Sequence, residues 1–292
     1  MSASGVRSVA VVGGGLMGSG IAEVVARAGF DVHVIEPYEA DLERARERIG
    51  ESLRRALEAG KLEDAAADEL LSRMRFLTSI EELPPCHLAI EAVVEDVTVK
   101  REVFRRLDSH LPAEALLASN TSSIPISELA AVTGRPDRVL GLHFFSPAPV
   151  MRLVEVVAAL DTTPETLETA DDFVTDLGKT AIQTKDRSGF VVNMLLVPYL
   201  LAAVRMYEEG FATAEAIDTG MRLGCGHPMG PLALCDLIGL DVLYAICNSL
   251  YDEFKQPQYS PPPLLKRMVA SGRLGRKSVK GFYEYDMVAA AA

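Results

Sequence analysis

A run of glycines between an apolar strand and a helix constrains the fold of this chain more than any other feature. Residues 8–12 are apolar and rich in β-branched side chains, and the glycine-rich segment 13–18 follows them directly. Apolar residues at helical spacing continue to Gly29, and residues 31–35 alternate as a second strand. Strand, tight turn, helix and strand make up a βαβ unit, and such units build parallel sheets covered by helices. The sequence therefore predicts an α/β fold.

The glycines of this segment have the spacing of a dinucleotide-binding turn. Gly13, Gly15 and Gly18 fit the pattern G-x-G-x-x-G. The first allows a tight turn, the second lets a pyrophosphate reach the backbone, and the third lets the helix pack closely on the strand. Leu16 and Met17 open the helix, whose unpaired N–H groups and positive dipole end attract phosphate. A tight turn without a ligand is the alternative interpretation.

An acidic residue at the end of the second strand indicates which dinucleotide binds. Glu36 follows Gly18 by 18 residues. A carboxylate there accepts hydrogen bonds from the adenosine ribose and repels a 2′-phosphate, which favours NAD over NADP. FAD-binding proteins share the glycine pattern, but NAD suits a chain with a single such unit better. We therefore predict NAD as the cofactor.

The rest of the chain divides into a strand-rich and a helix-rich part. Residues 40–73 are strongly charged and predict one or two exposed helices inserted after the second strand. Further strands are expected near 74–78, 87–92, 115–119, 138–143, 152–158 and 180–184, with a helix at 164–178. Helical periodicity then dominates at 189–209, 213–224, 230–254 and 262–271. We predict a Rossmann-type NAD-binding domain of residues 1–186, with a mostly parallel sheet, and an all-α C-terminal domain of residues 187–292.

Composition excludes several classes of function. The chain has 292 residues and a formal net charge of −12, which argues against a protein that coats nucleic acid. Its longest apolar run, near 191–204, is interrupted by Asn193 and Pro198 and is too short for a membrane span. The N-terminus lacks the pattern of a signal peptide, and the four cysteines match no zinc or disulfide framework. We expect a cytoplasmic protein without a bound metal.

Histidine is the natural base for chemistry at a hydroxyl group beside NAD. Of the five histidines, His33, His87 and His110 fit structural positions better than catalytic ones. His143 differs because it closes the apolar segment 138–143. That position is the carboxyl end of a predicted strand, where open α/β sheets bind their ligands. We therefore predict His143 as the base.

Glu155 is predicted to lie opposite this histidine. If 138–144 and 152–157 fold back as antiparallel strands around Pro149, positions 143 and 155 pair and their side chains share one face. A carboxylate beside an imidazole fixes its tautomer and stabilises its charged form. A buried structural ion pair at a hairpin is the alternative interpretation.

Two further polar groups could complete the site. Asn120 and Ser122 follow the predicted strand at 115–119, where they could bind a substrate oxygen or cap a turn. Asn193 is the single amide in an apolar helix that begins near Gly189. Because a buried amide needs partners, we predict that its side chain faces the site.

The chain resembles the 3-hydroxyacyl-CoA dehydrogenase family, in its short bacterial 3-hydroxybutyryl-CoA dehydrogenase form. The resemblance runs from about residue 9 to residue 285. The motifs on which it rests are GGGLMGSGIA (13–22), IEAVVED (90–96), ASNTSS (118–123), GLHFFSP (141–147), LVEV (153–156), SGFVVN (188–193), HPMGPL (227–232), GLD (239–241) and KGFYEY (280–285).

This resemblance implies a fatty-acid oxidoreductase that reversibly oxidises (S)-3-hydroxyacyl-CoA, 3-hydroxybutyryl-CoA above all, to 3-oxoacyl-CoA with NAD. It makes His143 the base and Glu155 its partner, with Ser122 and Asn193 bonded to the reacting part of the substrate. It also implies a helical domain that forms the substrate cleft and a homodimer interface. The resemblance further implies that Glu95 and Lys100 contact the nicotinamide-side ribose, and that Asn120 supports the motif that contains Ser122. Ser52 and Lys61 would lie near the CoA nucleotide.

Departures from the family pattern leave the substrate open. Ser146 stands where the family has Asn, and residues 187–194 lack a Pro and an Arg of the family motif. One alternative is the same chemistry on an acyl-carrier-protein thioester in secondary metabolism. Others are a sugar-acid dehydrogenase like the gulonate dehydrogenase and lambda-crystallin group, or a relative without catalysis. A CoA substrate would need a local basic patch, for which the inserted helices offer Arg48, Arg54, Arg55 and Lys61.

Overall fold

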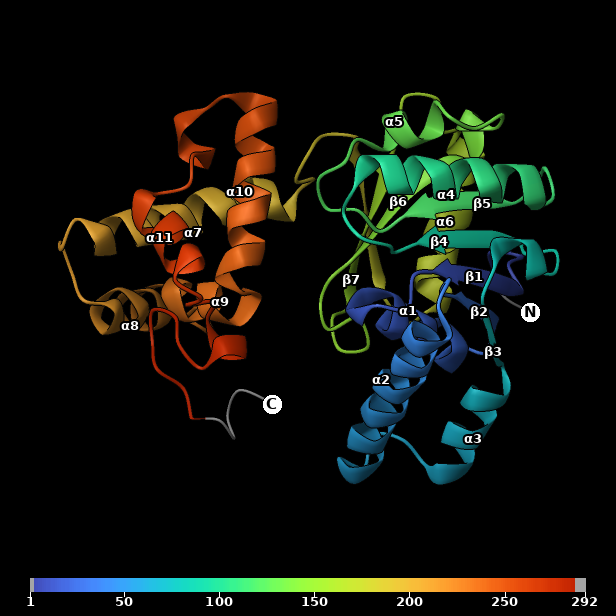
Figure 1. The fold of residues 1–292 in the computed structure, drawn as a ribbon, viewed down its shortest axis with the longest axis horizontal. Coiled ribbons are helices and arrows are strands. Elements are labelled where there is room, and N and C mark those ends of the chain that lie inside the picture. The colour runs from blue at the N-terminus through green and yellow to red at the C-terminus, as the bar shows by residue number, and fades with distance from the viewer. Residues whose placement is uncertain (1–2, 287–292) are drawn as a thin grey trace. The chain divides into compact units, whose positions relative to one another are not determined.

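The computed structural model describes residues 3–286 and divides the chain between Arg187 and Ser188 into two compact units (Figure 1). The first is built on a sheet with helices, and the second consists of helices. The predicted fold class, a mostly parallel α/β domain followed by an all-α domain, is confirmed.

The first unit contains one eight-stranded sheet in the order β3-β2-β1-β4-β5-β6-β7-β8. All neighbouring strands run parallel except β6 and β7, which are antiparallel. The strands are β1 (Ser8–Val12), β2 (Asp31–Ile35), β3 (Met74–Leu77), β4 (Leu88–Glu91), β5 (Leu116–Ser119), β6 (Val139–Phe144), β7 (Leu153–Ala158) and β8 (Thr180–Lys185). Its helices are α1 (Leu16–Arg27), α2 (Glu39–Glu58), α3 (Asp64–Ser72), α4 (Val97–His110), α5 (Ile126–Ala130) and α6 (Pro164–Asp176).

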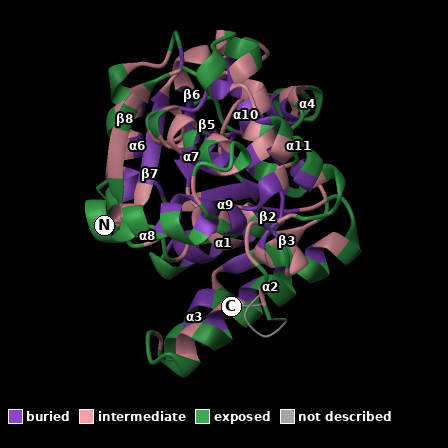
Figure 2. Ribbon diagram, turned by 90° about the vertical axis from the view of Figure 1, so that its left-hand side faces the viewer, coloured by how far each residue is buried: buried purple, intermediate pink, exposed green. Residues whose placement is uncertain are grey.

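Continuous apolar runs make the central strands suitable for a sheet covered on both faces. Every residue of β4, β5 and β6 is buried, and Figure 2 shows buried residues concentrated in the strands and on the inner faces of the helices. The few polar side chains at the carboxyl ends of these strands therefore lie beside a rigid apolar core.

The charged insertion of residues 40–73 forms two helices, α2 and α3, that extend away from the sheet (Figure 1). One apolar stripe of α2 is buried at i, i+3, i+7 and i+11, and the other faces of the helix carry charge. The stripe consists of Leu42, Ala45, Ile49 and Leu53.

The second unit packs α7 (Val192–Glu208), α8 (Ala214–Cys225), α9 (Pro231–Ile238), α10 (Leu240–Phe254) and α11 (Pro263–Ala270) around its own apolar core. The prediction of one helix over 230–254 is wrong, because Gly239 has a φ of 98° and ends α9. Within residues 3–286 no single helix has the length and hydropathy to span a membrane. The pair α9 and α10, bent by 96°, meets the criteria of length and composition together.

A buried aspartate holds the last described segment of the chain to α9. The side chain of Asp236 accepts hydrogen bonds from the backbone N–H groups of Phe282 and Tyr283, both at 3.0 Å, and from the Tyr285 hydroxyl at 2.9 Å. Burial raises the pKa of Asp236, and these donors oppose that rise. The KGFYEY segment thus has a structural function in this unit.

Candidate active site at the carboxyl ends of the strands

Close contacts require glycine at several positions of the turn after β1. Gly13 has a φ of 103°, and a Cβ on it would lie 2.5 Å from the carbonyl oxygen of Ala92. A Cβ on Gly18 would lie 1.8 Å from the carbonyl oxygen of Gly13, so α1 packs directly on the turn. By contrast, apart from Gly15 and its two chain neighbours, no protein atom lies within 4 Å of the corresponding position on Gly15. The backbone before α1 therefore faces open space, as a diphosphate site requires.

This contrast predicts different outcomes for two similar substitutions. Gly15→Ala has room in the protein, so we expect a melting temperature within about 2 °C of wild type and NADH binding at least about tenfold weaker. Gly18→Ala forces the helix off the strand, so we expect a melting temperature lower by about 5 °C or more. Differential scanning fluorimetry and NADH fluorescence titration measure both quantities. Unchanged NADH affinity in Gly15→Ala would contradict the assignment of this turn to the diphosphate.

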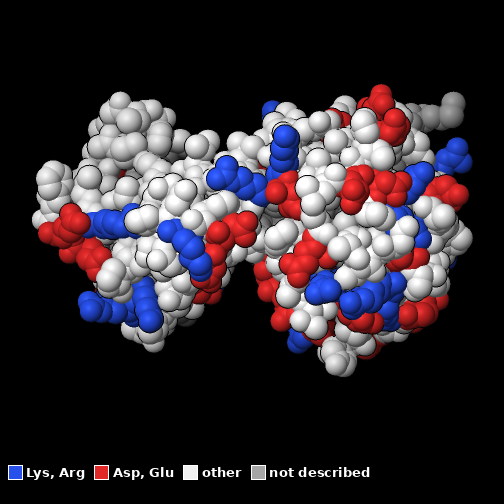
Figure 3. All heavy atoms as spheres, turned by 90° about the horizontal axis from the view of Figure 1, so that it is seen from above, with Lys and Arg blue, Asp and Glu red and all other residues white. Residues whose placement is uncertain are grey.

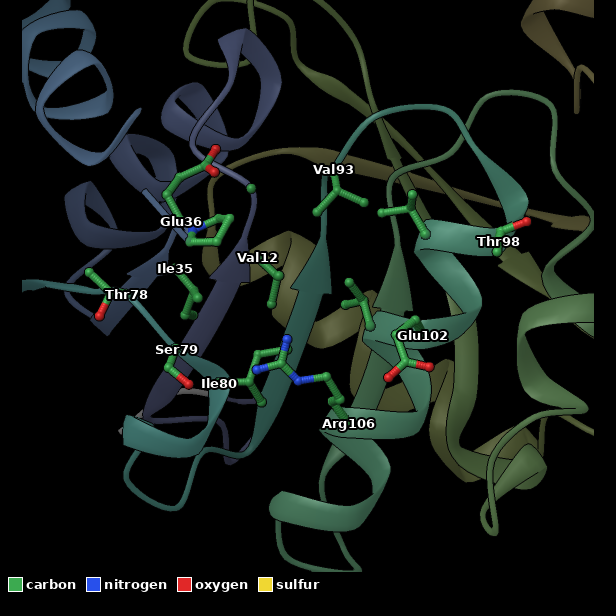
Figure 4. A pocket seen from close by; sticks show the side chains of 14 residues that line it. Val12, Ile35, Glu36, Thr78, Ser79, Ile80, Val93, Thr98, Glu102 and Arg106 are labelled. Atoms are coloured by element: carbon green, nitrogen blue, oxygen red, sulfur yellow. The ribbon is translucent and has the colours of Figure 1, made fainter. Parts of the chain in front are cut away.

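A mostly apolar cavity of about 400 Å³ lies beside the turn. Figure 4 shows Val12, Ile35 and Ile80 between Glu36 at the end of β2 and Arg106 on α4. An apolar cavity next to a carboxylate suits the adenine and ribose of a dinucleotide. Among the described residues no group of three or more His, Cys, Asp or Glu side chains could hold a metal ion.

Three charged side chains tie together the loops that follow β4 and β5. Lys100, with only 1% of its side chain exposed, lies 2.7 Å from Glu91 Oε1 and 3.1 Å from Glu95 Oε2. Glu91 is fully buried and also accepts a hydrogen bond of 2.6 Å from the Ser119 hydroxyl. Burial raises the pKa of Glu91, and the Lys100 ammonium opposes that rise. This cluster joins β4, β5 and α4 directly below the site.

Glu95 orders the loop that contains the predicted substrate-binding serine. Its Oε1 accepts hydrogen bonds from the Thr121 hydroxyl at 2.5 Å, the Ser123 hydroxyl at 2.9 Å and the Ser122 backbone N–H at 3.3 Å. Burial would raise the pKa of Glu95, but Lys100 and these hydroxyls outweigh it and lower the pKa. The Ser122 hydroxyl has no hydrogen-bond partner within residues 3–286, which leaves it available to a ligand.

Asn120 connects this loop to the strand that carries the predicted base. Its side-chain oxygen accepts a hydrogen bond of 2.9 Å from the backbone N–H of Phe144, the neighbour of His143. Its own backbone N–H donates to the Glu91 carbonyl at 2.8 Å. Asn120 thereby holds the carboxyl ends of β4, β5 and β6 in register.

The predicted pairing of His143 with Glu155 is confirmed. The two residues are opposite each other in the antiparallel β6–β7 ladder, and His143 Nδ1 lies 2.6 Å from Glu155 Oε2. The Glu155 side chain is fully buried and that of His143 is 9% exposed. The ring of Phe145 packs edge-on against the imidazole at 4.7 Å between centroids. Because the carboxylate accepts the Nδ1 proton, Nε2 is the nitrogen that can exchange a proton with a substrate.

Two other histidines have local partners far from this pair. His87 Nδ1 lies 3.0 Å from the Ser8 hydroxyl, and His110 Nε2 lies 2.9 Å from the carbonyl oxygen of Leu83. These contacts agree with the structural positions predicted for them.

Several predicted residues are not brought to this part of the first unit. Ser52 is half-buried on α2, and Lys61 is exposed after that helix. Asn193 is the second residue of α7 in the other unit, and its position at the reacting oxygen stays a prediction. The basic patch that we expected on α2 is partly neutralised. A glutamate on the same helix lies 3.9 Å from Arg54, and another lies 4.0 Å from Arg55.

The sequence interpretation did not name Glu91. The ammonium of Lys100 is enclosed by Glu91 and Glu95, and its predicted contact with the nicotinamide-side ribose stays a prediction. The signal for Glu91 was an acid inside the apolar strand β4, where a charge needs a buried partner. Arg48 donates a hydrogen bond of 3.1 Å to the carbonyl oxygen of Gly14, at the glycine turn.

Fold and site together define a class of protein: an oxidoreductase with a Rossmann-type dinucleotide-binding domain and a histidine–carboxylate pair at the carboxyl ends of its strands. The chain belongs to the 3-hydroxyacyl-CoA dehydrogenase family. The model of the family's NAD binding domain matches residues 8–187, and the model of its C-terminal domain matches residues 189–285.

Individual relatives match nearly the whole chain. A 3-hydroxybutyryl-CoA dehydrogenase of Mycobacterium tuberculosis is 54% identical over 282 residues, which cover 96% of this chain and 99% of the relative. The crystal structure of M. tuberculosis FadB2 has a TM-score of 0.95 at 53% identity and covers 96% of this chain and 99% of its own. That of (S)-3-hydroxybutyryl-CoA dehydrogenase from Ralstonia eutropha has a TM-score of 0.91 at 42% identity, with the same coverage.

Proposed function

We propose that the protein catalyses the reversible, NAD-dependent oxidation of (S)-3-hydroxyacyl-CoA, with 3-hydroxybutyryl-CoA preferred, to 3-oxoacyl-CoA. The observation that carries this proposal is the 2.6 Å contact between His143 and Glu155 at the carboxyl ends of the strands of an NAD-binding domain. Relatives named 3-hydroxybutyryl-CoA dehydrogenase that align over 94–96% of the chain support the choice of substrate.

His143 performs the proton transfer in this proposal. Its Nε2 takes the proton of the C3 hydroxyl while the C3 hydrogen leaves as hydride, and bound NAD supplies the nicotinamide ring that accepts this hydride. Glu155 keeps the Nδ1 proton in place and balances the charge of the imidazolium that forms. In the reverse direction the imidazolium returns its proton to the oxygen of the 3-oxoacyl group. A positioned base of this kind contributes a factor of about 10²–10⁴.

Ser122 and Asn193 are proposed to orient the reacting oxygen. The Ser122 hydroxyl is held in position by Glu95, which bonds the residues on both sides of it. Hydrogen bonds that strengthen as charge develops on the oxygen lower the barrier by a further factor of about 10²–10³.

The first unit has the groups needed to hold NAD. In this proposal the backbone N–H groups at Gly15, Leu16 and Met17 bind the diphosphate, and Glu36 binds the adenosine ribose. Figure 3 shows acidic and basic side chains mixed over the surface seen there. Backbone dipoles therefore explain how a chain with a net charge of −12 binds an anionic cofactor.

Ser52 and Lys61, on and after α2, are proposed to lie near the CoA nucleotide. We expect the double variant Lys61→Glu, Arg54→Glu to raise the KM for acetoacetyl-CoA by about tenfold, because two cations near three phosphates become anions. Initial rates at saturating NADH measure this KM. The double variant Arg44→Glu, Arg105→Glu is the control, because it changes the net charge by the same amount. An unchanged KM would mean that CoA binds elsewhere or that the carrier is not CoA.

A comparison of carriers and chain lengths tests the proposed substrate. We expect the highest kcat/KM for acetoacetyl-CoA among 3-oxoacyl-CoA thioesters of four to ten carbons, with NADH as reductant. A 3-oxobutyryl group on an acyl carrier protein, and gulonate with NAD, should react at least about tenfold less efficiently. A preference for either of these two would overturn the proposal.

A homodimer through the helical unit is also proposed. Leu195, Phe211 and Leu223 are more than 70% exposed in the single chain, which is unusual for large apolar side chains. Light scattering should give about twice the 31.5 kDa of one chain. Phe211→Glu with Leu223→Glu should give the monomer mass, and a monomeric wild type would contradict the proposal.

A further inference from the structure

One arginine of α2 differs from the others in its surroundings. Four of the five arginines on this helix have an acid partner three or four residues away. The pairs are Arg44 with Asp41, Arg46 with Glu43, Arg54 with Glu58 and Arg55 with Glu51. Arg48 forms no ion pair with any described carboxylate and instead donates its hydrogen bond of 3.1 Å to the Gly14 carbonyl oxygen. A cation without an ion-pair partner among the described residues is thus bonded to the glycine turn.

Arg48 and Glu36 bond the same residue of the turn from two different elements. Glu36 Oε1 accepts a hydrogen bond of 2.5 Å from the Gly14 N–H, and Arg48 Nη1 donates to the Gly14 carbonyl. The arrangement is fixed by packing, because a Cβ on Gly14 would lie 2.7 Å from Cβ of Ala45, one turn before Arg48. Ala45 itself is completely buried. A carboxylate and a guanidinium therefore both bond Gly14, beside the proposed site of the adenosine ribose.

These two groups have opposite preferences for the ribose. A carboxylate after the second strand accepts the 2′-hydroxyl of NAD and repels a 2′-phosphate, whereas a nearby arginine accommodates the 2′-phosphate of NADP. We propose that Arg48 is a latent NADP-binding residue, so that the Glu36 carboxylate alone excludes NADP from this site. This inference rests on dinucleotide binding at the glycine turn. The inference assigns Arg48 a function in cofactor specificity. The preference for NAD that Glu36 gives does not by itself require such a function.

Four proteins test the proposal: wild type, Glu36→Gln, Arg48→Gln and the double variant. The first readout is the affinity for 2′,5′-ADP and for ADP by isothermal titration calorimetry, which needs no catalysis. We expect Glu36→Gln to bind 2′,5′-ADP at least about tenfold more tightly than wild type does, because a charge repulsion is removed. We expect the double variant to bind 2′,5′-ADP about tenfold less tightly than Glu36→Gln does, because a charge-assisted contact to phosphate is lost. Its affinity for ADP should change less.

The second readout is kcat/KM with NADPH and NADH at saturating acetoacetyl-CoA. We expect Glu36→Gln to raise the NADPH value by about tenfold or more, and the double variant to lose most of that gain. Arg46→Gln is the matched control, because Arg46 is paired with Glu43 and should leave the ratio of the two cofactors unchanged. If Glu36→Gln unfolds at a lower temperature than wild type, Glu36→Ser replaces it in both measurements.

Four results would overturn the proposal. Glu36→Gln and Glu36→Ser could both fail to gain affinity for 2′,5′-ADP, or the gain could survive in the double variant. Equal loss of ADP and 2′,5′-ADP affinity in Arg48→Gln would assign the guanidinium to the diphosphate. A higher KM for acetoacetyl-CoA without a change in nucleotide affinity would assign it to the substrate. Failure of the proposed reaction would appear separately, as wild type that does not oxidise NADH.

Discussion

His143→Gln should lower kcat by about 10²–10⁴-fold and leave NADH affinity within about threefold of wild type. Glutamine fills a similar volume and still offers a hydrogen-bonding group to Glu155, but it cannot take or return a proton. The loss should therefore appear in kcat for both reaction directions. Steady-state rates with acetoacetyl-CoA and NADH, together with NADH fluorescence titration, measure the two quantities.

His87→Gln is the matched control for this variant. His87 precedes β4 and bonds Ser8 at the opposite ends of the strands, so its kcat should stay near that of wild type. If His143→Gln retained more than about a tenth of wild-type kcat, His143 would not be the base.

Glu155→Gln is expected to have the second largest effect on catalysis. It keeps the shape of the side chain and removes the buried negative charge that faces the imidazole at 2.6 Å. The imidazolium that forms during oxidation then loses its stabilising partner, so we expect kcat to fall by about 10–10³-fold. For the same reason the acidic limb of the pH–rate profile for oxidation should move to lower pH.

The pH–rate profile of Glu155→Gln distinguishes a catalytic function of the His143–Glu155 pair from a merely structural one. Rates of NAD reduction with (S)-3-hydroxybutyryl-CoA across pH 5–10, and melting temperatures over the same range, distinguish the two. A lower melting temperature with an unshifted profile would indicate that Glu155 only stabilises the β6–β7 hairpin.

The part of the site that was predictable from sequence depends on local geometry. His143 and Glu155 are only 12 residues apart on strands joined by one turn, so the hairpin register alone places them together. The glycine turn is equally local, because close contacts require Gly13 and Gly18, and Gly15 leaves the backbone open to a ligand. Most strands were predictable because a sheet covered on both faces needs continuous apolar runs.

The features that were missed depend on contacts between distant segments. Arg48 reaches Gly14 across 34 residues, and that contact exists only because the buried stripe of α2 docks on the turn. Ser119 reaches Glu91 across 28 residues, and the shielding of Lys100 follows from the packing of α4 on the sheet. The break at Gly239 was missed because the apolar spacing of 230–254 is helical on both sides of it.

The central claim is that this chain transfers hydride between NAD and C3 of a short acyl-CoA with the proton handled by His143. Its most direct measurement mixes the purified protein with NADH and acetoacetyl-CoA, follows the NADH absorbance and determines the configuration of the product. We predict consumption of one NADH for each (S)-3-hydroxybutyryl-CoA formed. No NADH consumption, or formation of the (R) product, would contradict the claim.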